Sequence, residues 1–444
     1  MANSQQLTRG PISRQLIFLS APLLAGNILQ QLYNTVDAVI VGRFVGESAF
    51  GAVGVSGSVM NLFLFLISGG CDGVGALLSQ FYGAEDGGSF RRGYYLAGLF
   101  GAGVSAALTG LGLLALPGLL ALLHTPDSVA AYAVDYLQII FLGFPAAFAY
   151  HLSSGVLRAV GNTRAALFFL ALSMGVNLAL DLIFVAGLEL GVAGAALATV
   201  LAQALAAGLC ALYLRLRFPE LMFHRADMVM DRSLLRHTAR FSFVTALHMC
   251  NRKLLVQGTV NALGEDAINA FTAATRVEGF ANSFGDSGAA AVAVFVGQNT
   301  GAGECGRVRQ GFRQGQKLLL VFGIFMSLVM VLRAEPCLRL VLPAGSSSSL
   351  EPAVGYLRLV ACFYIFNFLG SGLAGYFRGR GRVNIPVIGA TGHISLRVVL
   401  SALLAPGLGL PAVALATGLG WIGVVTFWNI LVRKEHEQPG EIRM

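Results

Sequence analysis

A stripe of polar side chains runs along one otherwise apolar stretch of the chain, residues 15–42. Asn27, Gln31 and Asn34 are three or four positions apart, which places them on one face of a helix, and Asp37 continues that face. Polar groups cost free energy in an apolar environment unless they meet water, a ligand or another polar group. We therefore expect this stripe to face a substrate path or a neighbouring helix.

A second polar pair lies in the apolar stretch 164–187. Asn177 and Asp181 are four positions apart and share a helix face. Asp37 and Asp181 both fall near the middle of an apolar stretch, where two carboxyl groups lose hydration and repel each other. Such a pair can hold a proton near neutral pH, or a small cation when it is ionised. The alternative is that these side chains only bridge helices through hydrogen bonds.

Other ionisable side chains in apolar stretches are further candidates for the substrate path, because an ionisable group inside a membrane span is costly. Asp72 belongs to a glycine-rich run, where we expect a tight helix contact. The remaining candidates are Arg252, Lys253, Arg276 and Glu278. Arg276 and Glu278 are two positions apart and cannot face each other on a helix, so Glu278 is expected to pair with a basic group elsewhere.

The composition explains why these residues must sit on membrane-spanning helices. Of the 444 residues, 56% are hydrophobic and only 12% are charged, about half the ~25% typical of soluble domains. Twelve apolar stretches are long enough to cross ~30 Å of hydrocarbon. The predicted fold is an all-α membrane protein with twelve transmembrane helices.

The two halves of the chain repeat each other. A shift of 218 positions aligns Gly46-Glu47-Ser48-Ala49 with Gly264-Glu265-Asp266-Ala267, and Ala196-Leu197-Ala198-Thr199 with Ala414-Leu415-Ala416-Thr417. An even number of spans in each unit makes this a parallel repeat, related by an axis along the membrane normal. We predict two pseudo-symmetric six-helix bundles: an N-lobe over 1–217, a cytoplasmic linker over 218–236, and a C-lobe over 237–444.

The basic residues predict the orientation in the membrane. If the N-terminus is inside, 22 of the 30 Lys and Arg residues fall in cytoplasmic segments and three fall outside. The positive-inside rule then places both termini in the cytoplasm. The location that follows is the inner, or plasma, membrane, with the chain crossing it many times.

Several classes of function are disfavoured. The basic residues follow the loops between spans, which argues against a nucleic-acid surface. None of the three lysines stands in a phosphate-binding Gly-Lys-Ser/Thr context, and the six cysteines form no CxxC pair. No nucleophile–base pair or metal-ligand spacing points to an enzyme. We expect no cofactor and no metal, apart from a coupling ion.

Three motifs resemble a known family. Residues 22–86 begin "PLLAGNILQQLYNTVDAVIVGRFVGESAFGAVGVSGS" and end "LLSQFYGAED", residues 157–185 read "LRAVGNTRAALFFLALSMGVNLALDLIFV", and residues 296–311 read "VGQNTGAGECGRVRQG". Together they resemble the multidrug and toxic compound extrusion (MATE) transporters over essentially the whole chain. The resemblance implies alternating access, driven by an inward proton or sodium gradient. Asp37 matches the acidic residue of the first helix used for cation coupling, and Asn177 and Asp181 match its partners on the fifth.

The function this implies is ion-coupled multidrug efflux, by antiport of amphipathic organic cations against H⁺ or Na⁺. The expected partners are small-molecule drugs and the lipid bilayer, and the chain is expected to act as a monomer. A flippase for a lipid-linked anionic substrate is the alternative, since such relatives use central basic residues that Arg252, Lys253 and Arg276 could supply.

Overall fold

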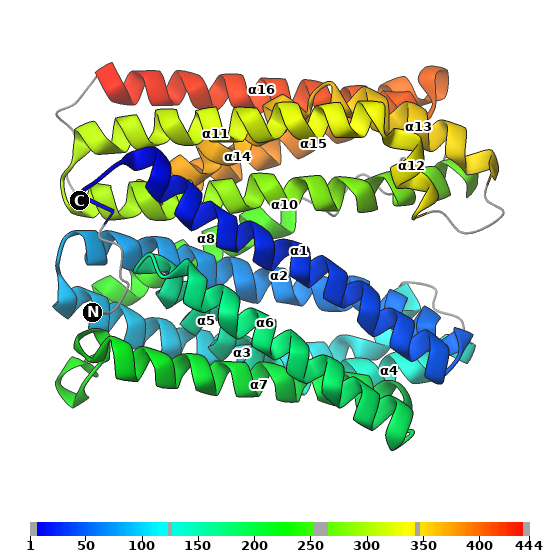
Figure 1. The fold of residues 1–444 in the computed structure, drawn as a ribbon, viewed down its shortest axis with the longest axis horizontal. Coiled ribbons are helices and arrows are strands. Elements are labelled where there is room, and N and C mark those ends of the chain that lie inside the picture. Colours follow the sequence, from blue (N-terminus) through cyan, green and yellow to red (C-terminus); the bar gives the residue numbers. More distant parts are fainter. Residues whose placement is uncertain (1–6, 123–126, 252–264, 342–346, 438–444) are drawn as a thin grey trace. The chain divides into compact units, whose positions relative to one another are not determined.

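The computed structural model describes residues 7–122, 127–251, 265–341 and 347–437, and every regular element in these ranges is helical. The chain divides into two compact units, which are drawn together in Figure 1. Unit 1 comprises Met1–Arg9, Ala21–Met249 and Gly297–Glu304, and unit 2 comprises Gly10–Ser20, Cys250–Val296 and Cys305–Met444. The predicted lobe and linker boundaries stay a prediction.

Unit 1 contains the helices of the first sequence repeat and the segment that follows it. Its elements are α1 (Ile12–Phe44, from Ala21 onward), α2 (Glu47–Gly83), α3 (Gly87–Leu122), α4 (Asp127–Leu142), α5 (Phe144–Ala159), α6 (Thr163–Asp181), the π-helix η1 (Leu182–Gly187), α7 (Gly191–Arg217), the short 3₁₀ turns η2 (Pro219–Leu221) and η3 (Arg225–Asp227), and α8 (Arg232–Asn251). The last turn of α10 also belongs to this unit.

Unit 2 contains the start of α1, up to Ser20, and the helices of the second repeat that follow α8. They are α10 (Glu265–Gly301), α11 (Cys305–Leu332), α12 (Ala334–Arg339), α13 (Ser347–Ala361), α14 (Tyr364–Gly379), α15 (Asn384–Leu408) and α16 (Leu410–Glu437). Within this unit α15 packs along α16, and α11 packs against α14.

The helices have the length and composition of membrane spans. Within the described ranges, eight helices pass this test alone, and the pairs α4–α5 and α13–α14 pass it as bent spans, with bends of 50° and 53°. Two longer helices remain beside the short α12: α8, which runs into residues outside the described ranges, and α10, which carries Glu278 and Asp286 among its apolar residues. These twelve correspond to the twelve predicted spans.

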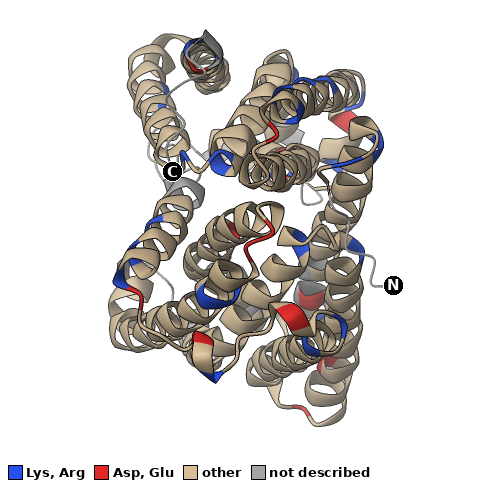
Figure 2. Ribbon diagram, turned by 90° about the vertical axis from the view of Figure 1, so that its left-hand side faces the viewer, with Lys and Arg blue, Asp and Glu red and all other residues tan. Residues whose placement is uncertain are grey.

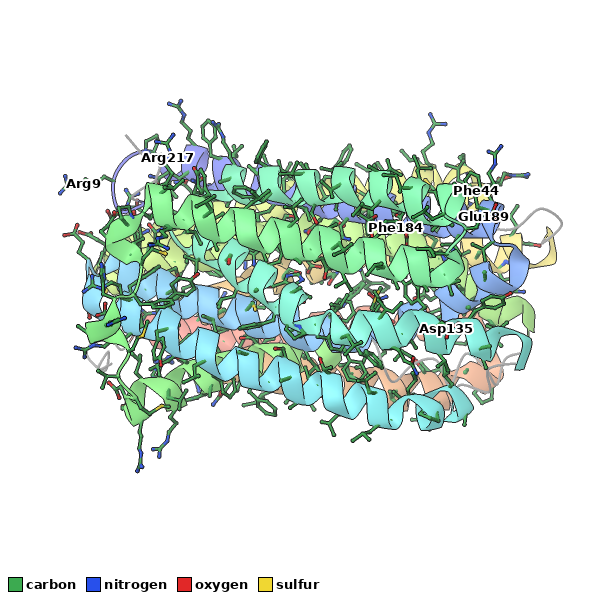
Figure 3. All side chains as sticks on the ribbon, turned by 90° about the horizontal axis from the view of Figure 1, so that it is seen from below. Arg9, Phe44, Asp135, Phe184, Glu189 and Arg217 are labelled. Atoms are coloured by element: carbon green, nitrogen blue, oxygen red, sulfur yellow. The ribbon has the colours of Figure 1, made fainter. Side chains whose placement is uncertain are left out.

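The ends of the unit 1 helices differ in charge. Arg9 and Arg217 lie at one end of the helices, whereas Phe44 and Glu189 lie at the other (Figure 3). Lys and Arg also occupy turns that face the viewer in the end-on view (Figure 2). This distribution agrees with the loop charges from which the orientation is predicted, and the orientation itself stays a prediction.

Close backbone contacts hold the centre of unit 1 together. Helix α2 packs on α5, and α5 packs in turn on α7. A Cβ atom added at Gly75 of α2 would lie 3.4 Å from the carbonyl oxygen of Gly155 of α5. Small residues allow this approach because dispersion and close packing, rather than water exclusion, drive helix association in a bilayer.

The segment after α7 is folded onto the start of α3. Arg91 of α3 donates from Nε to Oδ2 of Asp227 at 2.9 Å, and from Nη1 to the carbonyl of Glu220 at 3.2 Å. The backbone N–H of His224 also donates to Asp227 Oδ2, at 3.1 Å. This part of the predicted linker is therefore an ordered element of unit 1.

The last turns of α2 and α10 meet inside unit 1. A Cβ added at Gly83 would collide with the carbonyl oxygen of Gln298, and one added at Gly301 would collide with that of Gln80. Gln298 is fully buried, accepts the backbone N–H of Leu7 at 3.1 Å and donates to the carbonyl of Ala159 at 2.8 Å. One side chain thus links α10, α5 and the N-terminal segment.

Gly83→Ala tests this crossing. Because the added methyl group meets backbone rather than a movable side chain, we expect a loss of about 1–3 kcal/mol in stability, the usual cost of overpacking. Thermal unfolding of the purified protein in detergent measures the loss. Gly57→Ala on the same helix is the control, since nothing lies within 4 Å of its added Cβ. Equal melting temperatures for the two variants would contradict the crossing.

Asp227 supplies a pH-dependent contact. The His224 N–H and the Arg91 guanidinium hold the pKa of the Asp227 carboxyl below its ordinary value. A lowered pKa in the folded state means that the contact stabilises the fold above about pH 4, the unfolded value, and is lost as pH falls through the lower folded value. Asp227→Asn should therefore lower the melting temperature at pH 6 relative to wild type, and the gap should close towards pH 3. A gap that is constant with pH would show that the carboxylate charge does not matter.

Candidate functional site

Helix α1 brings the first predicted acid into the interior of unit 1. Asp37 is only 7% exposed, and its Oδ1 atom has no hydrogen-bond partner in the described part of the chain. Asn27 and Gln31, earlier on the predicted stripe, are half-buried and have polar or packing partners. The side chain of Asn34 lies outside the described residues. The stripe thus leads to one buried carboxyl group.

Helix α6 supplies the second acid at its final residue. The helix begins after Asn162, whose side chain accepts the backbone N–H of Ala165 at 3.2 Å, an N-cap that fixes the register. Asn177 and Asp181 are 2% and 1% exposed. Immediately after Asp181 the backbone changes to the π-helix η1, a rare conformation that is often found at functional sites.

A threonine on α7 organises the neutral part of the site. Thr199 Oγ1 donates to the carbonyl of Ala195 at 3.1 Å, accepts from Nδ2 of Asn177 at 3.2 Å, and lies 3.2 Å from the Tyr33 hydroxyl. A hydroxyl has one proton and two lone pairs, so Tyr33 must be the donor. The Thr199 hydroxyl then donates one hydrogen bond and accepts two, and these bonds fix the positions of Asn177 and Tyr33.

The remaining polar atoms are all acceptors. Oδ1 of Asp37, Oδ1 of Asn177 and both carboxylate oxygens of Asp181 are buried without a partner among the described residues. The two acids are near enough to interact directly with each other. Buried acceptors left without donors are costly, so this group of oxygens requires a proton, a water molecule or a cation.

Two tyrosines complete the site, and the sequence analysis missed both of them. Tyr136 of α4 is 2% exposed and interacts electrostatically with Asp37, Asp181 and Tyr33. Tyr33 stands one helical turn before Asp37, so the spacing that selected Gln31 and Asn34 could also have selected it. Tyr136 and Thr199 carried no such signal, because each is a single uncharged residue in an apolar stretch.

This arrangement can hold a proton or a small hard cation. Oxygen ligands from carboxylates and an amide are the type that Na⁺ and similar ions prefer. The described residues contain no cluster of three or more His, Cys, Asp and Glu side chains that could hold a transition metal. The pair of acids therefore depends on neutral neighbours, chiefly Asn177, for any further ligands.

Of the other predicted residues, Asp72 has a different partner within unit 1, and Arg276 and Glu278 belong to unit 2. Asp72 of α2 forms an ion pair with Arg158 of α5, with 2.8 Å between Oδ1 and Nη2. Arg276 of α10 is exposed, whereas Glu278 is 9% exposed and accepts a hydrogen bond from Tyr364 at 3.1 Å in unit 2. Arg252 and Lys253 lie outside the described residues, so their predicted pairing with Glu278 stays a prediction.

The combination of two repeats and one buried acid pair can be compared with known proteins. The model of the MatE family matches this chain twice, over residues 22–183 and 242–403. The chain belongs to the MatE family. The predicted family and the all-α, twelve-helix, two-repeat fold are thereby confirmed, and the chain is an integral membrane transporter rather than an enzyme.

Curated relatives extend over most of the chain. The chain is 27% identical over 420 residues to the probable multidrug resistance protein YpnP of Bacillus subtilis, covering 94% of this chain and 93% of that protein. It is 25% identical to the probable multidrug resistance protein NorM of Thermotoga maritima, with coverage of 85% and 82%. It is 24% identical to the FAD transporter of Shewanella oneidensis, with coverage of 82% and 81%.

Solved structures share the fold. A MOP superfamily transporter from Pyrococcus furiosus superposes with a TM-score of 0.91 at 20% identity, covering 99% of both chains. An outward-facing multidrug resistance MATE family transporter gives a TM-score of 0.91 at 21% identity, covering 98% of both chains. At these identities the likeness concerns the fold alone.

Thr199→Val tests the network in unit 1. Valine removes the shared acceptor and leaves the Asn177 amide and the Tyr33 hydroxyl without their partner. We expect a loss of about 1–3 kcal/mol in stability, the cost of unpaired buried groups. Thermal unfolding in detergent measures it, with Thr199→Ser, which keeps the hydroxyl, as the control. If serine and valine have the same effect, the hydroxyl does not organise the site.

Proposed function

We propose that the chain is a secondary active exporter of amphipathic organic compounds, driven by protons or Na⁺ that bind Asp37 and Asp181. The ion enters from the outside, neutralises the acid pair and favours a state with low affinity for the exported compound. It can do so only through a difference in its affinity for the two states. The expected location is the plasma membrane.

The observation that carries this proposal is the group of buried oxygens without donors. If both acids were ionised ~4 Å apart, their repulsion would be about 4 kcal/mol at an effective dielectric of 20. One proton or one Na⁺ removes most of that energy. Occupancy of the pair is therefore strongly linked to the ion concentration, which an ion-driven transporter requires.

The relatives support the class of substrate. Two of those reported above are named as probable multidrug resistance proteins, and a third is named as a FAD transporter. Tyr136 belongs to a buried apolar cluster of unit 1 that also contains Ile40 and Val41 of α1 and Val185 after α6. A cation site beside apolar helices suits amphipathic compounds, which carry both a charge and apolar groups.

A flippase for a lipid-linked anionic substrate is less well supported. Of the three basic residues on which this alternative rests, Arg276 is exposed and the other two lie outside the described residues. The acid pair attracts cations rather than anionic headgroups. Translocation of a fluorescent anionic lipid, measured beside dye export in the same vesicles, separates the two functions.

Asp37→Asn and Asp181→Asn test the ion coupling. Each substitution imitates the protonated acid, so export of ethidium from proteoliposomes under an imposed pH or Na⁺ gradient should fall to the level of empty vesicles. The double variant should be little worse than either single variant, because the pair acts as one unit. Dye binding without a gradient, measured by fluorescence anisotropy, should persist with reduced affinity, because the substitution favours the low-affinity state.

The matched control is Asp135→Asn, an exposed acid on α4 of the same unit (Figure 3). It should export ethidium at the wild-type rate. Wild-type export by Asp37→Asn, at equal amounts of reconstituted protein, would show that the acid pair is structural.

A further inference from the structure

The structure gives the register between the two repeats at the level of single residues. Helices α5 and α14 begin 220 residues apart and end 220 residues apart. The turns that follow them contain Gly161 and Gly381, with φ angles of 80° and 79°. The two stretches that match the family model are also 220 residues apart at both ends. A spacing of 220 therefore relates α4–α6 to α13–α15.

The spacing returns to 218 after the π-helix. Gly191 and Gly409, which precede the body of α7 and α16, both have a φ of 61°. The 218-residue spacing read from the sequence thus relates α2 to α10 and α7 to α16, and a 220-residue spacing relates α4–α6 to α13–α15 between them. An alignment at 218 throughout would set Val399 opposite Asp181, whereas the structure sets Ser401 there.

Part of the unit 1 site has a counterpart in unit 2. Tyr136 corresponds to Tyr356, and both tyrosines are buried. Thr199 corresponds to Thr417, and each threonine donates to the carbonyl four residues earlier, at 3.1 Å and 2.6 Å. The neutral framework of the site is therefore present in both units.

The charged part differs. At the 220-residue spacing Arg397 stands where unit 1 has Asn177, and Ser401 stands where it has Asp181. The acid of unit 2 comes from another helix: Glu278 of α10. The position that is acidic in unit 1 is thus next to a guanidinium group in unit 2.

Tyr356, Ser401 and Glu278 are buried, and Arg397 is half-buried. Glu278 Oε2 accepts from the Tyr364 hydroxyl at 3.1 Å, and both Tyr356 and Arg397 act on the same carboxylate. No ion pair within 4 Å joins Glu278 to Arg397 in the described part of unit 2. Trp421 packs edge-on against Tyr364, with ring centroids 5.2 Å apart, and adds an apolar wall.

Four polar atoms of this group have no hydrogen-bond partner among the described residues. They are Glu278 Oε1, the Tyr356 hydroxyl, Arg397 Nε and Ser401 Oγ. Unlike the unit 1 atoms, which are all acceptors, three of these four can donate. A group of buried donors beside a guanidinium accommodates an anion. The Glu278 carboxylate is itself an anion, so it competes with a bound anion for these donors.

We propose that Arg397, Tyr356 and Ser401 form a second binding site, which takes the carboxylate of an exported compound, and that Glu278 competes with this carboxylate for Arg397. The site rests on the proposed role as an exporter, but not on ion coupling. It would extend the range of exported compounds to those that carry a carboxylate.

The test compares two dyes that differ in one group: a xanthylium dye with a free benzoic acid, and the methyl ester of the same dye. Binding is measured by fluorescence anisotropy on the full-length protein in detergent without any gradient. Arg397→Gln should lower the acid-to-ester affinity ratio about tenfold or more, since a hydrogen bond to a charged group is lost. Glu278→Gln should raise the ratio severalfold, because the competing carboxylate is gone.

The opposite signs of the two effects distinguish a binding site from a structural ion pair. Arg358→Gln, an exposed arginine on α13 of the same unit, is the control and should leave the ratio unchanged. If both variants lower the affinities for acid and ester alike, or if neither changes the ratio, the site is overturned. Because binding is measured without any gradient, the acid-to-ester ratio does not depend on ion coupling, whereas ethidium export that survives in Asp37→Asn would refute the ion coupling and leave this ratio unaffected.

Discussion

The buried acids of unit 1 impose the main physical constraint on this molecule. Two carboxyl groups and one amide present four oxygens inside apolar helices without a donor among the described residues. Helical backbones satisfy their own hydrogen bonds and offer no spare N–H groups at mid-helix. The missing donor must therefore come from outside the fold, as a proton, water or cation. A transporter can use this requirement, because the stability of each state then depends on what occupies the site.

The sequence predicted the two acids and the amide of this candidate site and missed its hydroxyl groups. Asp37, Asn177 and Asp181 could be found because a charged or amide side chain in an apolar stretch is costly, and the four-residue spacing shows which of them share a face. Tyr136 and Thr199 could not be found, because neither residue is unusual on an apolar helix. Their role depends on which helices touch, and α1, α4, α6 and α7 are brought together only by tertiary packing.

The sequence predicts the fold better than it predicts the residue spacing between the two repeats. Composition and the length of the apolar stretches predict twelve spans, and two matched motifs reveal the repeat. The two-residue change of spacing leaves no visible trace, because it falls between apolar segments without distinctive residues. The π-helix after Asp181 accounts for the return from 220 to 218, since a wider turn takes up extra residues without breaking the helix.

The register changes how the second half of the chain is understood. At a uniform 218-residue spacing, unit 2 contains only an apolar counterpart to Asp181, and Glu278 and Arg397 look like unrelated charges. At the spacing of the helices themselves, Arg397 and Ser401 occupy the positions of Asn177 and Asp181, beside an equivalent tyrosine. A repeated scaffold keeps its buried polar position in both copies because the helix packing that shields it is shared. The sign of the charge there is then free to differ, provided that a neighbouring helix supplies the counter-charge, as α10 does with Glu278.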